Sequence, residues 1–220
     1  MNIEPVAYFR SPLKEKFGIP RQSGLAPDLP GQVRFVPPYD SPEAVRGLEG
    51  FDYCWLIWGF SLNQDVSSHL TVRPPRLGGN ERVGVFASRS PFRPNGMGLS
   101  CVRIGKVEPG LIEVFGADLA DGTPVYDVKP YVEYADSRPG VRSGFVDAKD
   151  WKPLSVEIPN ELEDIFLPSQ LEALIQVLSQ DPRPQYQDSP DRLYGMSFGG
   201  YEIKFTVSDG RLFVRSAEKC

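Results

Sequence analysis

The chain has 220 residues, a formal net charge of -5 at pH 7 and 40% hydrophobic residues. These values are ordinary for a globular protein, and the length fits one main domain with a smaller appendage. No apolar run approaches the roughly 20 residues of a membrane span, and residues 1–10 lack a signal-peptide pattern. Three widely spaced cysteines (Cys54, Cys101 and Cys220) fit neither a disulfide framework nor a zinc site. We therefore expect no metal, no membrane contact and a reducing, cytoplasmic location.

The absence of common catalytic motifs narrows the chemistry further. His69 is the single histidine, and the sequence contains no HExxH, CxxC, Walker loop or GxGxxG. Histidine-rich metal catalysis is thus excluded, and a doubly wound nucleotide fold loses support because no glycine-rich strand-to-helix turn of the right form is present. His69 itself lies in a polar run and is predicted to be an exposed loop residue.

The first half of the chain indicates short strands separated by turns. The 22 prolines and 21 glycines favour a mainly β fold. Strands are predicted at residues 3–10 and 33–36, and a brief helix opens at Ser41, which precedes a proline. The most apolar run, residues 51–60, predicts a strand buried on both faces, with Cys54, Trp55 and Trp58 as core residues.

A basic loop follows, at residues 84–100, with the sequence GVFASRSPFRPNGMGLS. Residues 71–106 carry seven basic side chains against one acidic side chain, on a protein that is acidic as a whole. Such an island can concentrate an anionic ligand at one place. A plain surface connection with solvated arginines is the alternative reading of this loop.

Two strands around Pro109-Gly110 predict a hairpin over residues 100–117. The segment DLADGTPVYDVKPY, residues 118–131, then combines a turn with three acids. Asp121 is interpreted as a turn-forming residue. Asp127 lies inside an alternating apolar run, where its charge requires a partner such as Lys129.

A polar, glycine-containing linker to residue 150 precedes a second, smaller unit. Leucines spaced along residues 167–180 predict an amphipathic helix, and residues 193–198, 201–207 and 211–216 predict three strands. Between them lies QDPRPQY, where Arg183 and Tyr186 offer a phosphate contact and a stacking surface for a base.

Five segments together resemble the TsaA-like family, which includes the TrmO-type tRNA (adenine-N6)-methyltransferases. They are KEKFGIPRQ, VRPPRLGGN, RSPFRPN with GLS, LADGTPVYDVKPY and QDPRPQY. The resemblance implies a mainly β fold, with a TsaA-like β-barrel catalytic domain at 1–145 and a small α+β domain at 151–220. It also implies a homodimer that uses S-adenosylmethionine to methylate N6 of threonylcarbamoyl-adenosine beside the anticodon of tRNA.

Matching the family's motifs places the cofactor site on the following residues: Pro20, Arg21, Gln22, Ser61, Leu62, Arg89, Leu99, Asp118, Leu119, Ala120, Asp121 and Gly122. Two departures stand out. Relatives commonly carry proline and isoleucine where this chain has Gly96 and Met97, and a more polar pair in place of Ser61 and Leu62.

The implied reaction is an in-line methyl displacement, which depends on positioning more than on acid or base strength. Asp127, Lys129 and Asn95 are the candidate catalytic residues, with Asp127 and Lys129 orienting the substituted N6 group and Asn95 contacting an adenine or amide edge. Arg89 and Arg93 suit carboxylate or phosphate. Substrate contacts are assigned to Arg93, Arg183, Tyr186 and Arg192.

Two other functions stay open at this point: a non-enzymatic RNA-binding or anion-binding module, and a methyltransferase for another substrate. The position of the second unit indicates tRNA docking. Its removal is therefore expected to spare cofactor binding and abolish tRNA methylation.

Overall fold

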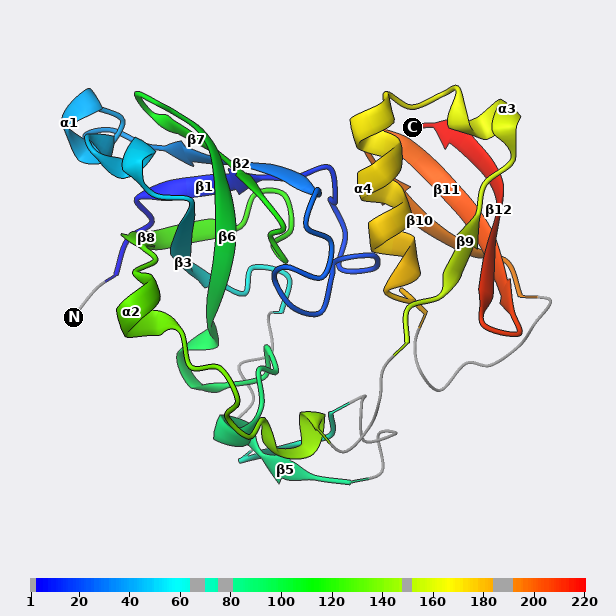
Figure 1. The fold of residues 1–220 in the computed structure, drawn as a ribbon, viewed down its shortest axis with the longest axis horizontal. Helices are drawn as coiled ribbons and strands as arrows, with labels where there is room; N and C mark the ends of the chain where they lie inside the picture. Colours follow the sequence, from blue (N-terminus) through cyan, green and yellow to red (C-terminus); the bar gives the residue numbers. More distant parts are fainter. Residues whose placement is uncertain (1–2, 64–69, 75–80, 148–151, 184–191) are drawn as a thin grey trace.

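The computed structural model describes residues 3–63, 70–74, 81–147, 152–183 and 192–220. It has two lobes, a β-barrel and a smaller sheet covered by a helix (Figure 1). The fold is thus mainly β with a small α+β C-terminal unit, which confirms the predicted fold class. His69 and much of the VRPPRLGGN segment lie outside the described residues.

The barrel consists of six antiparallel strands that close in the order β1-β2-β7-β6-β3-β8. The β6–β7 hairpin confirms the one predicted around Pro109-Gly110, whereas β1 is shorter than expected and β2 begins earlier. The strands are β1 (Ala7–Arg10), β2 (Pro30–Phe35), β3 (Tyr53–Gly59), β6 (Met97–Glu108), β7 (Leu111–Phe115) and β8 (Pro124–Pro130).

Strand β3 is buried on one face, and the expectation of burial on both faces is wrong. Cys54, Leu56 and Trp58 point into the barrel core, while Tyr53 is 43% exposed. Trp55 is only partly buried, and its Nε1 donates a hydrogen bond to Asp136 Oδ2 at 3.0 Å on the outer face. A closed barrel buries only the inward residue of each pair, so even an apolar strand alternates.

Short elements surround the barrel. A two-stranded sheet pairs β4 with β5 below it in the view of Figure 1. The remaining pieces are single turns of helix. The bounds of these two strands and of the helical turns are α1 (Pro42–Val45), η1 (Leu48–Gly50), β4 (Thr71–Val72), β5 (Val83–Gly84), η3 (Val85–Ala87), η4 (Pro94–Gly96), α2 (Glu133–Asp136) and η5 (Gly144–Val146).

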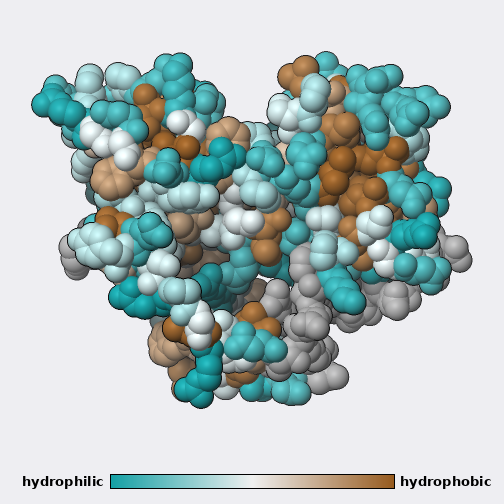
Figure 2. Space-filling model, viewed as in Figure 1, coloured by the Kyte–Doolittle hydropathy of each residue, from teal (hydrophilic) through white to brown (hydrophobic). Residues whose placement is uncertain are grey.

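The C-terminal lobe is a four-stranded sheet in the order β10-β11-β12-β9, with α4 on one face. Three strands and the helix match the prediction, but β9 was missed because it spans three residues and pairs in parallel with β12. The elements are β9 (Ser155–Glu157), α3 (Asn160–Glu163), α4 (Pro168–Ser179), β10 (Tyr194–Phe198), β11 (Tyr201–Ser208) and β12 (Arg211–Lys219). Figure 2 shows apolar side chains gathered between α4 and β9.

The connection from β1 to β2, residues 11–29, packs into the core of the C-terminal lobe. Leu13, Ala26 and Leu29 are at most 1% exposed and belong to the same apolar cluster as the residues of α4 and the sheet. Phe17 stacks on Phe205 with ring centroids 6.5 Å apart. In Figure 1 this connection lies between the barrel and α4. We call residues 11–29 the bridging loop.

Candidate functional site

Most of the predicted cofactor residues lie at one end of the barrel. At this end β1, β3 and β7 finish and β2, β6 and β8 begin, because all six strands are antiparallel. The bridging loop, the segment after β3, the basic loop before β6 and the turn between β7 and β8 all emerge here. Sequence-distant motifs are thus brought to one rim by strand order alone.

Asp118 lies at the centre of this rim. Its Oδ1 accepts a hydrogen bond from Ser100 Oγ, and its carboxylate also accepts the backbone N–H of Ser23 from the bridging loop. Arg89 of the basic loop lies close enough to act on Asp118 electrostatically, and its Nη1 donates to Gln22 Oε1. Three of the predicted cofactor residues, Gln22, Arg89 and Asp118, therefore form one polar cluster.

Burial raises the pKa of Asp118, because the charged carboxylate loses water. The hydrogen bond from Ser100, backbone N–H donors and the positive charge of Arg89 act in the opposite direction and favour the charged form. A carboxylate whose pKa is raised by burial and lowered by several hydrogen-bond donors is typical of a binding site.

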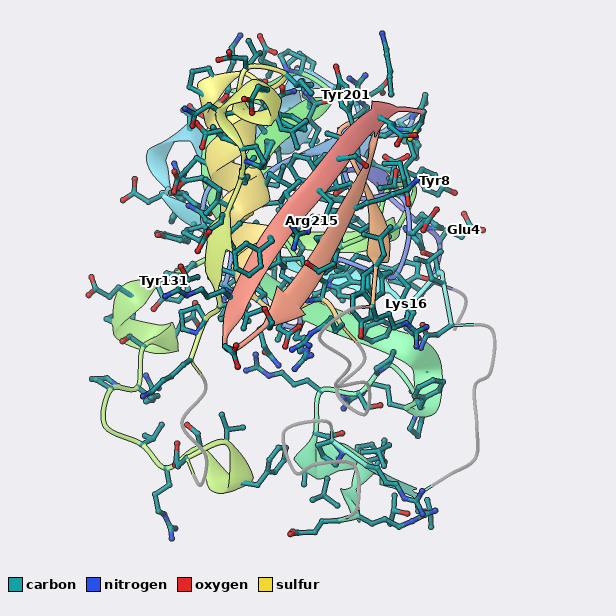
Figure 3. All side chains as sticks on the ribbon, turned by 90° about the vertical axis from the view of Figure 1, so that its right-hand side faces the viewer. Glu4, Tyr8, Lys16, Tyr131, Tyr201 and Arg215 are labelled. Carbon is teal, nitrogen blue, oxygen red and sulfur yellow. The ribbon has the colours of Figure 1, made fainter. Side chains whose placement is uncertain are left out.

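The basic loop contacts the bridging loop a second time. Lys16 Nζ, whose residue is labelled in Figure 3, lies 5.3 Å from the ring centroid of Phe92. Within the basic loop, Arg93 Nη1 donates to the backbone oxygen of Ser88 at 2.9 Å, so this predicted substrate residue also shapes the loop. Asn95 is exposed and left-handed, with φ of 66°.

Gly96 follows with φ of 55°, a conformation that proline cannot adopt because its ring fixes φ near -65°. A proline at position 96 could therefore not follow the backbone path that this chain takes.

The segment after β3 meets the turn before β8. Ser61 Oγ lies 3.5 Å from Thr123 Oγ1, and Leu62 is 45% exposed. The adjacent Asn63 has a buried Nδ2 that finds no hydrogen-bond partner among the described residues. Such an orphaned donor is costly unless a ligand accepts from it.

The turn of residues 118–122 is fixed by backbone bonds to β1 and the bridging loop. Asp121 Oδ1 accepts from Ser11 N at 3.1 Å, and its Oδ2 lies 3.5 Å from Arg10 Nη1. Gly122, with φ of 76°, donates its N–H to Phe9 O at 2.8 Å. Leu119 and Ala120 are buried. Asp121 has the turn-forming contacts that the sequence predicts for it.

Leu99, Asp127 and Lys129 lie elsewhere, on the outer face of the barrel. Leu99 and Asp127 each pair with Ile57 in the sheet register, and Leu99 is 58% exposed. Lys129 Nζ contacts Asp127 Oδ2 at 2.8 Å, which confirms the predicted partner. Tyr131, on the same side of the barrel, lies far from Lys16 in Figure 3. Asp127 and Lys129 thus form an exposed ion pair, and among the described residues neither side chain is hydrogen-bonded or ion-paired to Gln22, Arg89 or Asp118.

The predicted substrate residues of the C-terminal lobe lie beyond α4. Arg183 holds Asp181 with both Nε and Nη2, at 2.8 and 3.0 Å. Arg21 of the bridging loop donates to the backbone oxygen of Asp181 at 3.4 Å. Arg192 lies over the ring of Tyr194 at 5.4 Å. Tyr186 lies outside the described residues.

Sequence reasoning missed Ser100, Trp58, Asn63 and Thr123 as members of this rim. Ser100 had a usable signal, since it is a polar residue at an inward position of an otherwise apolar strand. Pro20, which was predicted to contact the cofactor, is buried in the bridging loop. This position suits a residue that shapes the backbone of the loop.

Across the part of the chain that the structure describes, no group of three or more His, Cys, Asp or Glu residues is placed to hold a metal ion. No helix there has the length and apolarity to cross a membrane. The three cysteines are free, and burial raises the pKa of Cys54 to about 12.

Comparisons with known proteins agree with this architecture. A family model described as the tRNA-methyltransferase O N-terminal domain matches residues 8–137, and the TrmO C-terminal domain matches residues 152–219. The tRNA (adenine(37)-N6)-methyltransferase of Escherichia coli is 37% identical over 227 residues, which cover 98% of this chain and 97% of that protein. RcsF of Pseudomonas aeruginosa, whose name assigns it provisionally to the S-adenosylmethionine-dependent methyltransferases, is 43% identical over 92% of this chain and 90% of that one. The crystal structure of TrmO from Pseudomonas aeruginosa has a TM-score of 0.82 at 33% identity, over 99% of this chain and 97% of that chain. The chain belongs to the tRNA-methyltransferase O family.

Proposed function

We propose that this protein is an S-adenosylmethionine-dependent tRNA methyltransferase that methylates N6 of the adenine at position 37, in threonylcarbamoyl-adenosine. The observation that carries the proposal is the cluster of Gln22, Arg89 and Asp118 at the barrel rim, in a chain of the tRNA-methyltransferase O family. Family membership also favours this activity over a non-enzymatic RNA-binding module.

The side chains at the rim suit the chemistry of S-adenosylmethionine. Its methionine end carries a carboxylate and an ammonium group, and the cluster offers the guanidinium of Arg89 and the carboxylate of Asp118 side by side. The orphaned Nδ2 of Asn63 is a further donor without a protein acceptor. Arg89 would hold the carboxylate, and Asp118 a cationic or hydroxyl group of the cofactor.

The cofactor supplies an electrophilic methyl group when it is bound. The protein's part is to hold the acceptor nitrogen in line and to exclude competing water, which is the role of a positioned rim rather than of a strong base. The carbamoyl substituent already acidifies the N6 proton. In such a transfer the N6–methyl bond would form as the methyl–sulfur bond breaks, and solvent or a nearby carboxylate would accept the N6 proton.

Isothermal titration calorimetry with S-adenosylmethionine tests the cofactor assignment. Arg89→Ala should weaken binding by roughly 10-fold or more, the size expected for a lost charged hydrogen bond. Arg34→Ala is a matched control, because Arg34 is an exposed arginine of β2 that bonds only locally, to Gln32. Unchanged binding in Arg89→Ala would contradict the assignment.

The tRNA assignment is tested separately by mass spectrometry of anticodon-loop nucleosides from cells that lack the protein. Loss of the N6-methyl mark supports this substrate. An unchanged methyl level would leave a methyltransferase acting on another substrate.

We keep Asp127, Lys129 and Asn95 as proposed substrate-orienting residues. Their support is the exposed Asp127–Lys129 ion pair on β8, which only β3 separates from Leu99 on β6, and the exposed amide of Asn95 at the rim. Because an exposed pair contributes at most about 1 kcal/mol to stability, Asp127→Asn should leave folding intact. Undiminished turnover and cofactor affinity in this variant would refute the role.

A homodimer is proposed as the working unit, as the resemblance implies. Its support is the outer face of β6, β3 and β8, where Leu99 pairs with Ile57 and the rings of Tyr53 and Trp55 contact Tyr131. Two predicted site residues, Leu99 and Asp127, lie on this face. A second copy of the chain packed here would place them near an interface. Light scattering of Leu99→Glu should show monomers, and a monomeric wild type would contradict the dimer.

The remaining assignments concern RNA contact and location. Arg183 and Arg192 lie where α4 ends and β10 begins, next to the bridging loop, so we propose that the C-terminal lobe contacts tRNA there.

The division into a catalytic unit at 1–145 and a docking unit at 151–220 stays a proposal. Three free cysteines and a tRNA substrate fit the cytoplasm.

A further inference from the structure

Ser100 is a fully buried hydroxyl on the inward face of β6. It is 0% exposed and lies between the inward residues Gly98 and Val102. Burying a hydroxyl costs free energy unless it is hydrogen-bonded. Its two partners, Trp58 and Asp118, therefore account for its presence among apolar residues.

The direction of the two hydrogen bonds is determined by the donor groups. The indole Nε1 of Trp58 can only donate, and it lies 2.9 Å from Ser100 Oγ. Ser100 therefore accepts from Trp58, and its own proton is available for Asp118 Oδ1, the second contact of the hydroxyl. The chain of bonds runs one way, from Trp58 through Ser100 to Asp118.

Gly98 makes room for this arrangement. A Cβ at position 98 would come within 2.3 Å of Trp58 Cε2, closer than real side chains approach. Gly98 and Trp58 are directly paired in the β3–β6 register, and the indole ring covers the place where a side chain would be. In the GLS segment, residues 98–100, the glycine thus leaves space for the indole ring of Trp58, and the serine hydroxyl bonds to Trp58 and Asp118.

We infer that Trp58, Gly98 and Ser100 position the carboxylate of Asp118 in the cofactor site. The inference rests on the proposed function, because Asp118 is assigned there to S-adenosylmethionine. The three residues act through Asp118 and do not themselves touch the cofactor. Their role is to fix the orientation of the Asp118 carboxylate through its Oδ1, next to Arg89.

The pH dependence of binding gives this role a distinct signature. Burial raises the pKa of Asp118, and the hydrogen bond from Ser100 lowers it, together with Arg89 and the N–H of Ser23. Binding that needs the charged carboxylate is lost as the pH falls through this pKa. Removing the Ser100 hydroxyl raises the pKa further, so the loss of binding moves to higher pH.

The test uses Ser100→Ala and Trp58→Phe in the full-length protein, with two readouts. Carbon-13 NMR of the Asp118 carboxyl in the cofactor-free protein should show its titration moving upward in pH, more in Ser100→Ala than in Trp58→Phe. Calorimetry near neutral pH should show S-adenosylmethionine binding weakened by roughly 10-fold in Ser100→Ala. Ser197→Ala, which removes another buried serine hydroxyl from the C-terminal sheet, is the control and should change neither readout.

A double variant decides whether Ser100 acts through Asp118. In an Asp118→Asn background, Ser100→Ala should weaken cofactor binding no further. An unmoved Asp118 titration in both Ser100→Ala and Trp58→Phe, or full additivity with Asp118→Asn, would overturn the inference. Because the NMR titration needs no cofactor, a wild type that binds no S-adenosylmethionine would refute the proposed function while the titration still judges the Ser100 contact.

Discussion

The two lobes build their apolar cores in different ways. Among the described residues, the barrel core draws on its own strands and the elements directly attached to them, from Ala7 to Val125. The core of the C-terminal lobe also takes Leu13, Ala26 and Leu29 from the bridging loop between two barrel strands. The smaller lobe therefore holds the loop that carries Gln22 and Ser23 to Arg89 and Asp118, in the proposed cofactor site.

This difference changes the expected role of the C-terminal lobe. From the sequence, its removal was expected to spare cofactor binding. In the structure, removal would expose Leu13 and Leu29 and free the loop that contacts Arg89 and Asp118. We therefore expect the lobe to support the proposed cofactor site in addition to its proposed contact with tRNA.

Deleting residues 148–220 should have the largest effect. We now expect both S-adenosylmethionine binding and tRNA methylation to be lost, because the bridging loop would lose its apolar contacts. Circular dichroism of the deletion variant would show whether the barrel persists, and calorimetry would measure binding. A folded barrel that binds the cofactor normally would show that the loop needs no support.

Two leucine substitutions in the shared core separate stability from support of the loop. Leu13→Ala and Leu212→Ala each remove a fully buried side chain, from the bridging loop and from β12. Each should lower the free energy of unfolding by about 2–5 kcal/mol. At a temperature where both variants are folded, only Leu13→Ala should weaken cofactor binding. Equal binding in the two variants would argue against the distinction.

Gly18 provides a smaller, more local perturbation of the contact between loop and lobe. It has φ of 94°, and an added Cβ would lie 2.5 Å from Met196 Cε. Gly18→Ala should cost about 1–3 kcal/mol in unfolding free energy. Gly210→Ala is the matched control, since Gly210 has φ of 74° with nothing within 4 Å of the added Cβ. Denaturant unfolding should rank Gly18→Ala as the more destabilised variant, and the opposite order would place the tight contact elsewhere.

The polar contact between α4 and the bridging loop should matter least. Gln176 Nε2 donates to Asp28 Oδ2 at 2.7 Å, and Asp28 N donates to Gln176 Oε1 at 2.9 Å. These groups are exposed, so Gln176→Ala should cost only about 0.5–1.5 kcal/mol. Thermal unfolding of Gln176→Ala, compared with the wild type, measures the difference. A loss above that of Leu13→Ala would show that the loop is held by polar contacts instead.

Local sequence patterns were enough for the hairpin at Pro109-Gly110, the helix of residues 167–180 and the Asp127–Lys129 ion pair. Each depends on residues close in the chain, where turn chemistry and side-chain periodicity act directly. The three-residue strand β9 lacked such a pattern, because its pairing with β12 is parallel and distant in sequence. Trp55 was misjudged because apolar composition does not distinguish the inner face of a barrel strand from the outer one.

The amino-acid sequence by itself determined the mainly β class and the family, and its motifs led to the proposed cofactor residues Gln22, Arg89 and Asp118. Only the tertiary structure decided which of these motifs meet at the barrel rim, that Leu99 and Asp127 face outward, and that Ser100 holds Asp118. The shared core of the bridging loop was also decided there. The reason is physical: strand order and register bring distant residues together, and closure of the barrel assigns each residue to one of its two faces.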